Sequence, residues 1–143
     1  MPVHRIFLDA NVLVAVLCNE YPRFSACARM LSLADDKRFR VYSSPLCLAI
    51  GAYFAAKKGD RKRVRQRIGL LAEKLRITTM GQEAARRALA DPRIQDLEDG
   101  MQYFSAVEAG CTHIITYDRK DFHYADLTVQ EPEDFLWDHV VKR

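Results

Sequence analysis

Two kinds of apolar pattern alternate along this chain: short continuous runs, and longer segments in which apolar residues recur at helical spacing. Short runs bounded by polar residues are typical of buried strands, whereas the helical spacing is typical of amphipathic helices. Extended segments are predicted at 3–8, 39–42, 76–79, 112–116 and 127–129. Helices are predicted between and after them, at 9–18, 24–34, 46–58, 60–75, 81–90, 96–110 and 132–141.

The alternation of strands and helices predicts an α/β fold. Each helix would carry the chain back over the sheet by a right-handed crossover, so neighbouring strands pair in parallel. We therefore expect a three-layer α/β/α sandwich with a central, mostly parallel sheet. The chain of 143 residues is predicted to form one domain, residues 1–143, that buries about two thirds of its unfolded surface.

Two of the predicted strands lead into a carboxylate. The first apolar run stops at Asp9, directly before an apolar helical segment, and the fourth run is followed by Asp118. In open α/β sheets, ligands bind at the carboxyl ends of the strands, close to the point where the strand order reverses. If these two strands lie side by side there, Asp9 and Asp118 share one crevice.

A third group of acids opens the helix predicted at 96–110. Asp96 suits a helix N-cap, and acids in a first turn suit the helix dipole, so Asp96 is explained by helix structure alone. Asp99 is different because its helix leads directly into the strand before Asp118. Carboxylates crowded together raise one another's pKa unless a cation lies between them. Mg²⁺ or Mn²⁺, which prefer carboxylate oxygens and water, would provide that cation.

The charge balance matters through its distribution along the chain. The excess of 22 basic over 19 acidic residues gives a net charge of only +3. The densest basic run lies at 57–67, and its candidate nucleic-acid contacts are Arg61, Lys62, Arg63, Arg65 and Arg67. Two interpretations remain open, a solvated helix face or a set of non-specific phosphate contacts.

Composition also bears on location and on the core. No apolar run approaches the roughly 20 residues of a membrane span, and Asp9 interrupts the one candidate for a signal peptide, so a cytoplasmic protein without a membrane partner is expected.

The four cysteines form no C-x-x-C pair, which favours reduced thiols. A structural role is predicted for His4, His113, His123 and His139. A core position is predicted for Phe24, Tyr53, Phe54, Tyr103, Phe104, Phe135 and Trp137.

The acidic segments, taken in order, resemble those of a PIN domain, and the resemblance is greatest to VapC-type toxins of bacterial toxin–antitoxin pairs. It is carried by the segments Leu8-Asp9-Ala10-Asn11-Val12, Asp96-Leu97-Glu98-Asp99 and Ile115-Thr116-Tyr117-Asp118. The resemblance implies a metal-dependent endoribonuclease that uses Mg²⁺ or Mn²⁺ to hydrolyse RNA phosphodiester bonds. It also implies an antitoxin partner and a homodimer.

Residue roles follow from the resemblance position by position. Asp9 matches the metal ligand after the first strand, and Asn11 lies beside it in the same turn. Asp99 matches the ligand at the helix start, and Asp118 the ligand after the fourth strand. Thr116 matches a hydroxyl residue that orients Asp118 or a metal-bound water.

One position departs from the family pattern. The family's second acid is a Glu in the helix after the second strand, and Ala49 occupies that place here. Glu98 or Asp96 could compensate from the neighbouring helix start. Alternatively, the chain is a catalytically weakened PIN-fold module that binds RNA or protein. A phosphatase of the haloacid dehalogenase type also begins with an Asp after its first strand, but it requires a second Asp where Asn11 stands.

Overall fold

The computed structural model describes residues 3–141 and contains a five-stranded sheet in the order β3-β2-β1-β4-β5. All four strand pairs are parallel. The strands are β1 (His4–Leu8), β2 (Phe39–Ser43), β3 (Arg76–Ile77), β4 (His113–Ile115) and β5 (Thr128–Gln130). The strand order reverses between β1 and β4, so the carboxyl ends of these two strands frame the crevice where ligands bind in such sheets.

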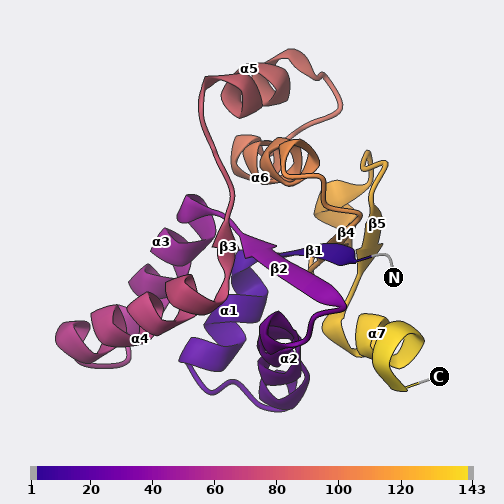
Figure 1. Cartoon of the computed structure of the whole chain (residues 1–143). Coiled ribbons are helices and arrows are strands. Elements are labelled where there is room, and N and C mark those ends of the chain that lie inside the picture. The colour runs from indigo at the N-terminus through magenta and orange to yellow at the C-terminus, as the bar shows by residue number, and fades with distance from the viewer. Residues whose placement is uncertain (1–2, 142–143) are drawn as a thin grey trace.

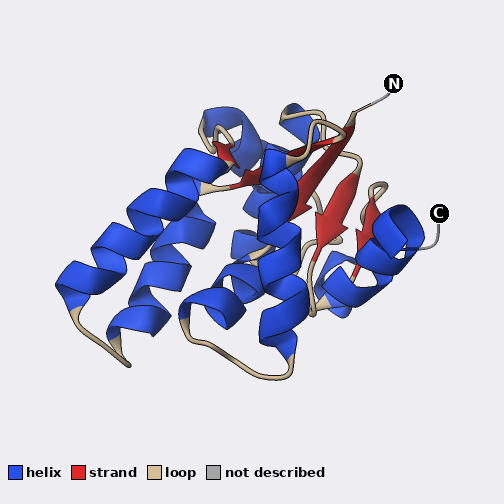
Figure 2. Ribbon diagram, turned by 60° about the horizontal axis from the view of Figure 1, so that its bottom comes forward, coloured by secondary structure: helices blue, strands red, loops and turns tan. Residues whose placement is uncertain are grey.

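Helices flank both faces of the twisted sheet, which confirms the predicted α/β/α sandwich (Figure 2). In Figure 1, α5 and α6 lie on the opposite side of the sheet from α1 and α2. The helices are α1 (Ala10–Leu17), α2 (Arg23–Ser32), α3 (Pro45–Ala56), α4 (Arg61–Lys74), α5 (Gln82–Ala90), α6 (Leu97–Glu108) and α7 (Pro132–Leu136). Shorter helical turns are η1 (Leu33–Asp35), η2 (Arg119–Phe122) and η3 (Trp137–Val141).

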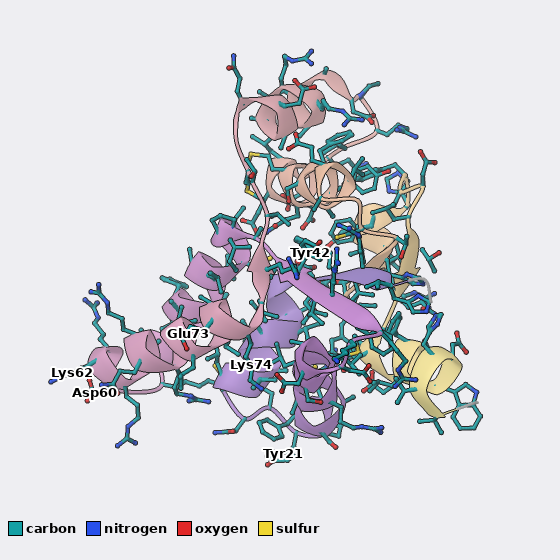
Figure 3. The ribbon with its side chains drawn as sticks, viewed as in Figure 1. Tyr21, Tyr42, Asp60, Lys62, Glu73 and Lys74 are labelled. Carbon is teal, nitrogen blue, oxygen red and sulfur yellow. The ribbon has the colours of Figure 1, made fainter. Side chains whose placement is uncertain are left out.

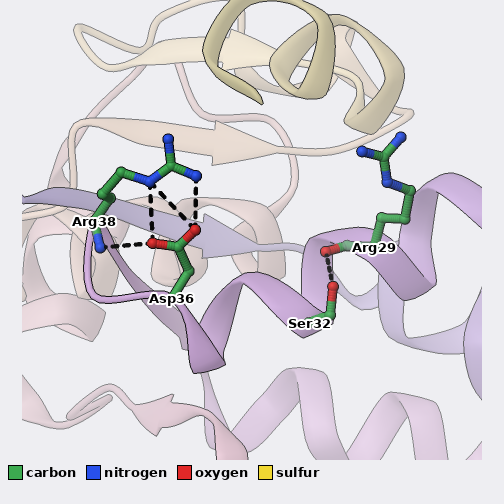
Figure 4. Close-up of polar contacts among 4 residues, drawn as sticks. All are labelled: Arg29, Ser32, Asp36 and Arg38. Atoms are coloured by element: carbon green, nitrogen blue, oxygen red, sulfur yellow. Dashed lines mark hydrogen bonds and ion pairs between the residues drawn. The ribbon is translucent and has the colours of Figure 1, made fainter. Parts of the chain in front are cut away.

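Local hydrogen bonds fix where several elements begin. The Ser44 hydroxyl accepts from the Cys47 amide at 3.0 Å at the start of α3, and Asp60 caps α4 in the same way. Before β2, the Asp36 carboxylate accepts from the backbone and the guanidinium of Arg38, at distances down to 2.7 Å (Figure 4). Ser32 donates to the Arg29 carbonyl at the end of α2 (Figure 4). These contacts close the turns that lead into the sheet and into its crossover helices.

Three predicted elements differ from the structure. The terminal helix is not continuous, because α7 ends at Leu136 and the wider π-helical turn η3 follows. The segment predicted as a loop at 117–124 contains the 3₁₀ turn η2. The strand expected at 76–79 has only two residues, since it pairs with β2 at the sheet edge for that length alone.

The central strands and the inner faces of the helices form the main core. Ile6, Phe7 and Leu8 of β1 have no exposed surface, which accords with a strand covered on both faces. Of the aromatic residues predicted to be buried, Tyr103, Phe104 and Phe135 are.

The prediction is wrong for three aromatic residues. Tyr53, Phe54 and Trp137 are 59%, 45% and 57% exposed. Tyr53 and Phe54 lie on the outer side of α3, where the ammonium of Lys57 packs over both rings. Trp137 lies beyond the end of α7. Phe24 is only half-buried.

Two sequence expectations concern thiols and membranes. Cys18, Cys27, Cys47 and Cys111 are all free thiols. Within residues 3–141, none of the helices combines the length and the apolar character that crossing a membrane requires.

Candidate active site

Asp9 lies at the end of β1 and serves as the N-cap of α1. Its Oδ1 accepts from the Ala10 amide at 2.8 Å, and its Oδ2 accepts from the Thr116 hydroxyl at 2.9 Å. The register explains this contact, because Leu8 pairs with Ile115 and the next residue on each strand is then Asp9 and Thr116. The carboxylate is only 6% exposed.

Asn11 connects the start of α1 to the loop after β4. Its Nδ2 donates to the Thr116 hydroxyl at 3.0 Å and to Asp118 Oδ2 at 3.1 Å. The Asp118 amide also donates to the Thr116 hydroxyl, at 3.0 Å. Thr116 therefore accepts two hydrogen bonds and gives its proton to Asp9, which places Asp9, Asn11 and Asp118 around a single hydroxyl group.

Asp99 approaches the same crevice from α6. Asp96 is the N-cap of that helix and accepts from the amides of Glu98 and Asp99 at 2.9 and 3.3 Å, as its position predicted. This cap leaves the half-buried carboxylate of Asp99 one turn into the helix. Burial raises the pKa of Asp99 to about 7, and the negative charge of Asp9 is the next cause.

The pKa of Asp9 is raised to about 6. Burial is the main cause, and it outweighs the hydrogen bonds from Ala10 and Thr116 that stabilise the ionised form. The charges of Asp118 and Glu98 raise it further. The charge of Asp9 thus disfavours ionisation of Asp99, which comes from a distant part of the chain. No salt bridge neutralises either of them within residues 3–141.

Two adjoining hollows open beside these acids. One, of about 410 Å³, is lined by Asp96, Asp99 and Tyr124 among others, and the second, of about 930 Å³, includes Asp118. They share the walls formed by Lys120, Asp121 and His123. Asp9 lines neither hollow and is buried. The hollows therefore give access to Asp99 and Asp118, whereas Asp9 is shielded from solvent.

The donor set fits a hard divalent cation, because it consists of carboxylate oxygens, the ligands that Mg²⁺ and Mn²⁺ prefer. Burial and neighbouring negative charges raise the pKa values of Asp9 and Asp99, and a bound cation would favour their ionised forms. In the described part of the chain, no three acidic, histidine or cysteine side chains are grouped closely enough to hold an ion as they stand. Asp118 is exposed and Asp99 is half-buried, so both carboxylates are accessible from solvent.

The helix that would supply the family's second acid carries none. Ala49 is exposed on α3, and no residue of Pro45–Ala56 is acidic. Of the two acids expected to compensate, Asp96 is occupied as an N-cap, whereas the Glu98 carboxylate is exposed and its charge raises the pKa of both Asp9 and Asp99.

The predicted nucleic-acid contacts lie away from the acids. Lys62 and Asp60 are at the outer end of the hairpin formed by α3 and α4 (Figure 3). Because α3 starts beside the crevice and has 12 residues, it carries the chain about 18 Å outward. Arg61, Lys62, Arg63 and Arg65 are exposed, and Arg67 is half-buried and donates to the Val16 carbonyl. The structure does not bring this basic run into contact with the acidic cluster.

Several residues near the site were not identified from the sequence. His123, expected to be structural, is exposed and lines both hollows. The other three histidines do pack together through ring contacts at the opposite end of β1 and β4. Gln102 of α6 accepts from the Ser44 hydroxyl and so joins α6 to the start of α3. Its helical spacing from Asp99 was the one available signal.

Comparison with known proteins places this geometry in a family. A model described as "PIN domain" matches residues 5–120. Ribonuclease VapC1 of Aquifex aeolicus (strain VF5) is 26% identical over 139 residues, which cover 94% of this chain and 95% of that protein.

Solved structures share the fold at lower sequence identity. VapBC2 from Rickettsia felis, bound to a DNA fragment from its promoter, gives a TM-score of 0.66 at 14% identity and covers 89% of this chain and 97% of its own. VapC20 from Mycobacterium tuberculosis, a Sarcin-Ricin loop cleaving toxin, gives a TM-score of 0.63 at 17% identity. The match covers 86% of this chain and 98% of that chain. The fold agrees with these structures, and because the family model spans well over half of the sequence, the chain belongs to the PIN domain family.

Proposed function

We propose that this protein is an endoribonuclease that depends on Mg²⁺ or Mn²⁺, and that it is the toxin of a toxin–antitoxin pair. The observation that carries the proposal is the convergence of Asp9 and Asp99, two acids from distant parts of the chain whose burial raises their pKa values to about 6 and 7. Membership of the PIN family and similarity to a protein named as a ribonuclease support the choice of RNA as substrate.

In this proposal, Asp9, Asp99 and Asp118 would hold the ion. When bound, such an ion lowers the pKa of a coordinated water and stabilises negative charge on a phosphate. Asn11 fixes Asp118 through its Nδ2 hydrogen bond, and Thr116 holds Asp9 with its proton. These bonds set the direction of each carboxylate before substrate arrives, which reduces the reorganisation that catalysis would need.

Glu98 is the acid we propose in place of the missing one in α3. Asp96 is less suitable because its Oδ1 accepts the first amides of α6, and a metal would compete with the cap. Glu98 is exposed, lies one residue before Asp99, and makes no hydrogen bond through its side chain among those found in the described residues.

Partners are proposed on the same footing. Similarity to the structure of VapBC2 supports an antitoxin as the expected protein partner. A homodimer is proposed from the family resemblance alone. The exposed rings of Tyr53, Phe54 and Trp137 are apolar surface available for such contacts. The exposed arginines of α4 would make non-specific contacts with RNA phosphates outside the crevice.

A second function is favoured by one observation. Helix α3 supplies no acid, which is what a PIN-fold binding module without catalysis would show. Such a module would bind RNA or protein and leave RNA intact.

Cleavage of a labelled single-stranded RNA separates the two functions. The wild-type protein is expected to cut it with Mn²⁺ present and to stop on addition of EDTA. Asp9→Asn protein, purified in parallel, controls for contaminating ribonuclease. Intact RNA with the wild-type protein, or equal cleavage by the variant, would contradict the proposed activity.

A further inference from the structure

Tyr117 lies between the two residues whose side chains meet at the crevice, Thr116 and Asp118, and it contacts three other elements. Its amide donates to Asn11 Oδ1 at 3.3 Å. Its hydroxyl donates to the Glu133 carboxylate of α7, whose two oxygens are 3.0 and 2.9 Å away, and it lies 3.6 Å from the Cys27 sulfur of α2. The loop after β4 is thereby tied to α1, α2 and α7 through one residue.

The ring of Tyr117 is held as well as its hydroxyl. The guanidinium of Arg23, at the first residue of α2, stacks over the ring at 4.0 Å from its centre. A cation over an aromatic face and a phenol donating to a carboxylate are both favourable contacts, and the second is charge-assisted. Tyr117 is half-buried and Glu133 is exposed, so this arrangement is not a by-product of core packing.

The hydrogen bonds continue from Tyr117 into the acidic cluster. Asn11 accepts from the Tyr117 amide with its oxygen, and with its nitrogen it donates to Thr116 and Asp118. Rotating Asn11 would therefore release the Asp118 carboxylate and one of the bonds that orient Thr116. A shift of the loop at Tyr117 would therefore change the orientation of the Asp118 carboxylate and of the Thr116 hydroxyl together.

We propose that the Tyr117–Glu133 hydrogen bond positions the loop after β4, and that it thereby orients Asn11 and Asp118. This orientation would set the affinity of the crevice for a divalent cation. The inference rests on the proposed function of that site and adds to it two residues that act through Asn11: Tyr117, which also lines the larger hollow, and Glu133, which lines neither hollow. Supporting residues of this kind commonly change metal affinity or activity by about 10–100-fold when removed.

Tyr117→Phe removes the hydroxyl and keeps the ring beneath Arg23. We expect Mn²⁺ affinity, measured by calorimetry, to fall about tenfold. We expect the kcat for RNA cleavage to fall by a similar factor and KM to change less, because the ring of Tyr117, a residue that lines the larger hollow, is kept. A residue that only stabilises the fold would lower the melting temperature and leave the metal affinity of the folded protein unchanged.

A mutant cycle tests whether the two residues act through one bond. Glu133→Ala is expected to reproduce the loss seen in Tyr117→Phe, and the double variant to lose no more than either single one. Glu133→Gln keeps a carbonyl acceptor and is expected to recover part of the affinity. Asp134→Ala is the matched control, since it removes the neighbouring exposed acid of α7 and is expected to behave as wild type.

The side-chain amide signals of Asn11 provide a readout that needs neither metal nor activity. The chain has two asparagines, Asn11 and Asn19, so labelling asparagine with ¹⁵N and comparing an Asn19→Ser variant assigns them. Tyr117→Phe and Glu133→Ala should shift or broaden the Asn11 signals in the metal-free protein, and Asp134→Ala should not. Unchanged Asn11 signals in both variants would overturn the proposal even if the protein cleaves RNA. Shifted signals in a protein without ribonuclease activity would support the positioning role and count against the proposed function alone.

Discussion

The acidic crevice and the basic start of α4 differ in how separation along the sequence relates to distance in the folded protein. Asp9 and Asp118 are more than a hundred residues apart in the sequence. In the fold, the Thr116 hydroxyl donates a hydrogen bond to the Asp9 carboxylate and accepts one from the Asp118 amide, and Asn11 donates to the Asp118 carboxylate. The basic residues are neighbours in the sequence but lie exposed on one helix at the outer end of a hairpin (Figure 3). A dense charge run is therefore a weaker sign of a site than separated charges at strand ends.

The energetic difference between the two regions follows from burial. The protein carries Asp9 and Asp99 in positions where burial makes ionisation costly, and perturbed acids that converge in this way are typical of functional sites. The arginines of α4 remain in water, where their charge costs little and interactions with neighbours are screened. The comparison predicts large effects from the crevice and small ones from the hairpin.

The largest expected effect is loss of cleavage when an acid is removed from the crevice. Asp9→Asn and Asp99→Asn should each lower the kcat for RNA by at least about a hundredfold, since each removes a charge that would hold the ion. Asp60→Asn, which keeps a capping side chain at the outer end of the hairpin, is the control and should retain activity in the same gel assay. Losses of similar size in all three variants would erase the contrast between the regions.

The second effect concerns stability of the metal-free protein. The folded pKa of Asp99, about 7, lies above its unfolded value near 3.8, so protonation stabilises the fold and that stabilisation is lost as pH rises through 7. At pH 8, Asp99→Asn should raise the free energy of unfolding in urea with EDTA by about 1–2 kcal/mol. Arg63→Gln should change it by less than about 0.5 kcal/mol. A destabilised Asp99→Asn protein would mean that this carboxylate is not under electrostatic strain.

The third effect is the pH dependence of metal binding. An ion that binds Asp9 and Asp99 must displace protons held with pKa values of about 6 and 7. Mn²⁺ affinity should therefore rise from pH 5.5 to 7.5 and level off above that. Calorimetry in buffers of different ionisation enthalpy should detect proton release at pH 6 and little at pH 8. Equal affinity at both pH values would contradict these assignments.

The smallest expected effect belongs to the hairpin. Neutralising Arg61, Arg63 and Arg65 together with Gln should flatten the dependence of RNA affinity on salt concentration, because fewer counterions are released from the phosphates. Filter binding with Asp9→Asn protein, which binds without cutting, measures the slope between low and moderate salt. A slope equal to that of the unsubstituted protein would favour a solvated helix face.

Sequence patterns predicted the parallel sheet, apart from the length of β3, and the edge of the sheet at which Asp9 and Asp118 meet. Apolar runs ending on Asp9 and before Asp118 predict adjacent strand ends, because parallel strands deliver their carboxyl ends to one edge. The exposure of Tyr53 and Trp137 was not predictable in the same way, since it depends on how far α3 and α7 extend beyond the core. The Tyr117–Glu133 bond joins a loop to a helix 16 positions later, and no local pattern marks such a pair.

Titration of Mn²⁺ into the wild-type protein and into Asp9→Asn and Asp99→Asn proteins by calorimetry addresses the central claim most directly. If carboxylates from β1 and α6 converge on one cation, the wild-type protein binds Mn²⁺ and each substitution alone abolishes or strongly weakens that binding. Equal binding by all three proteins, or none by the wild type, would contradict the account.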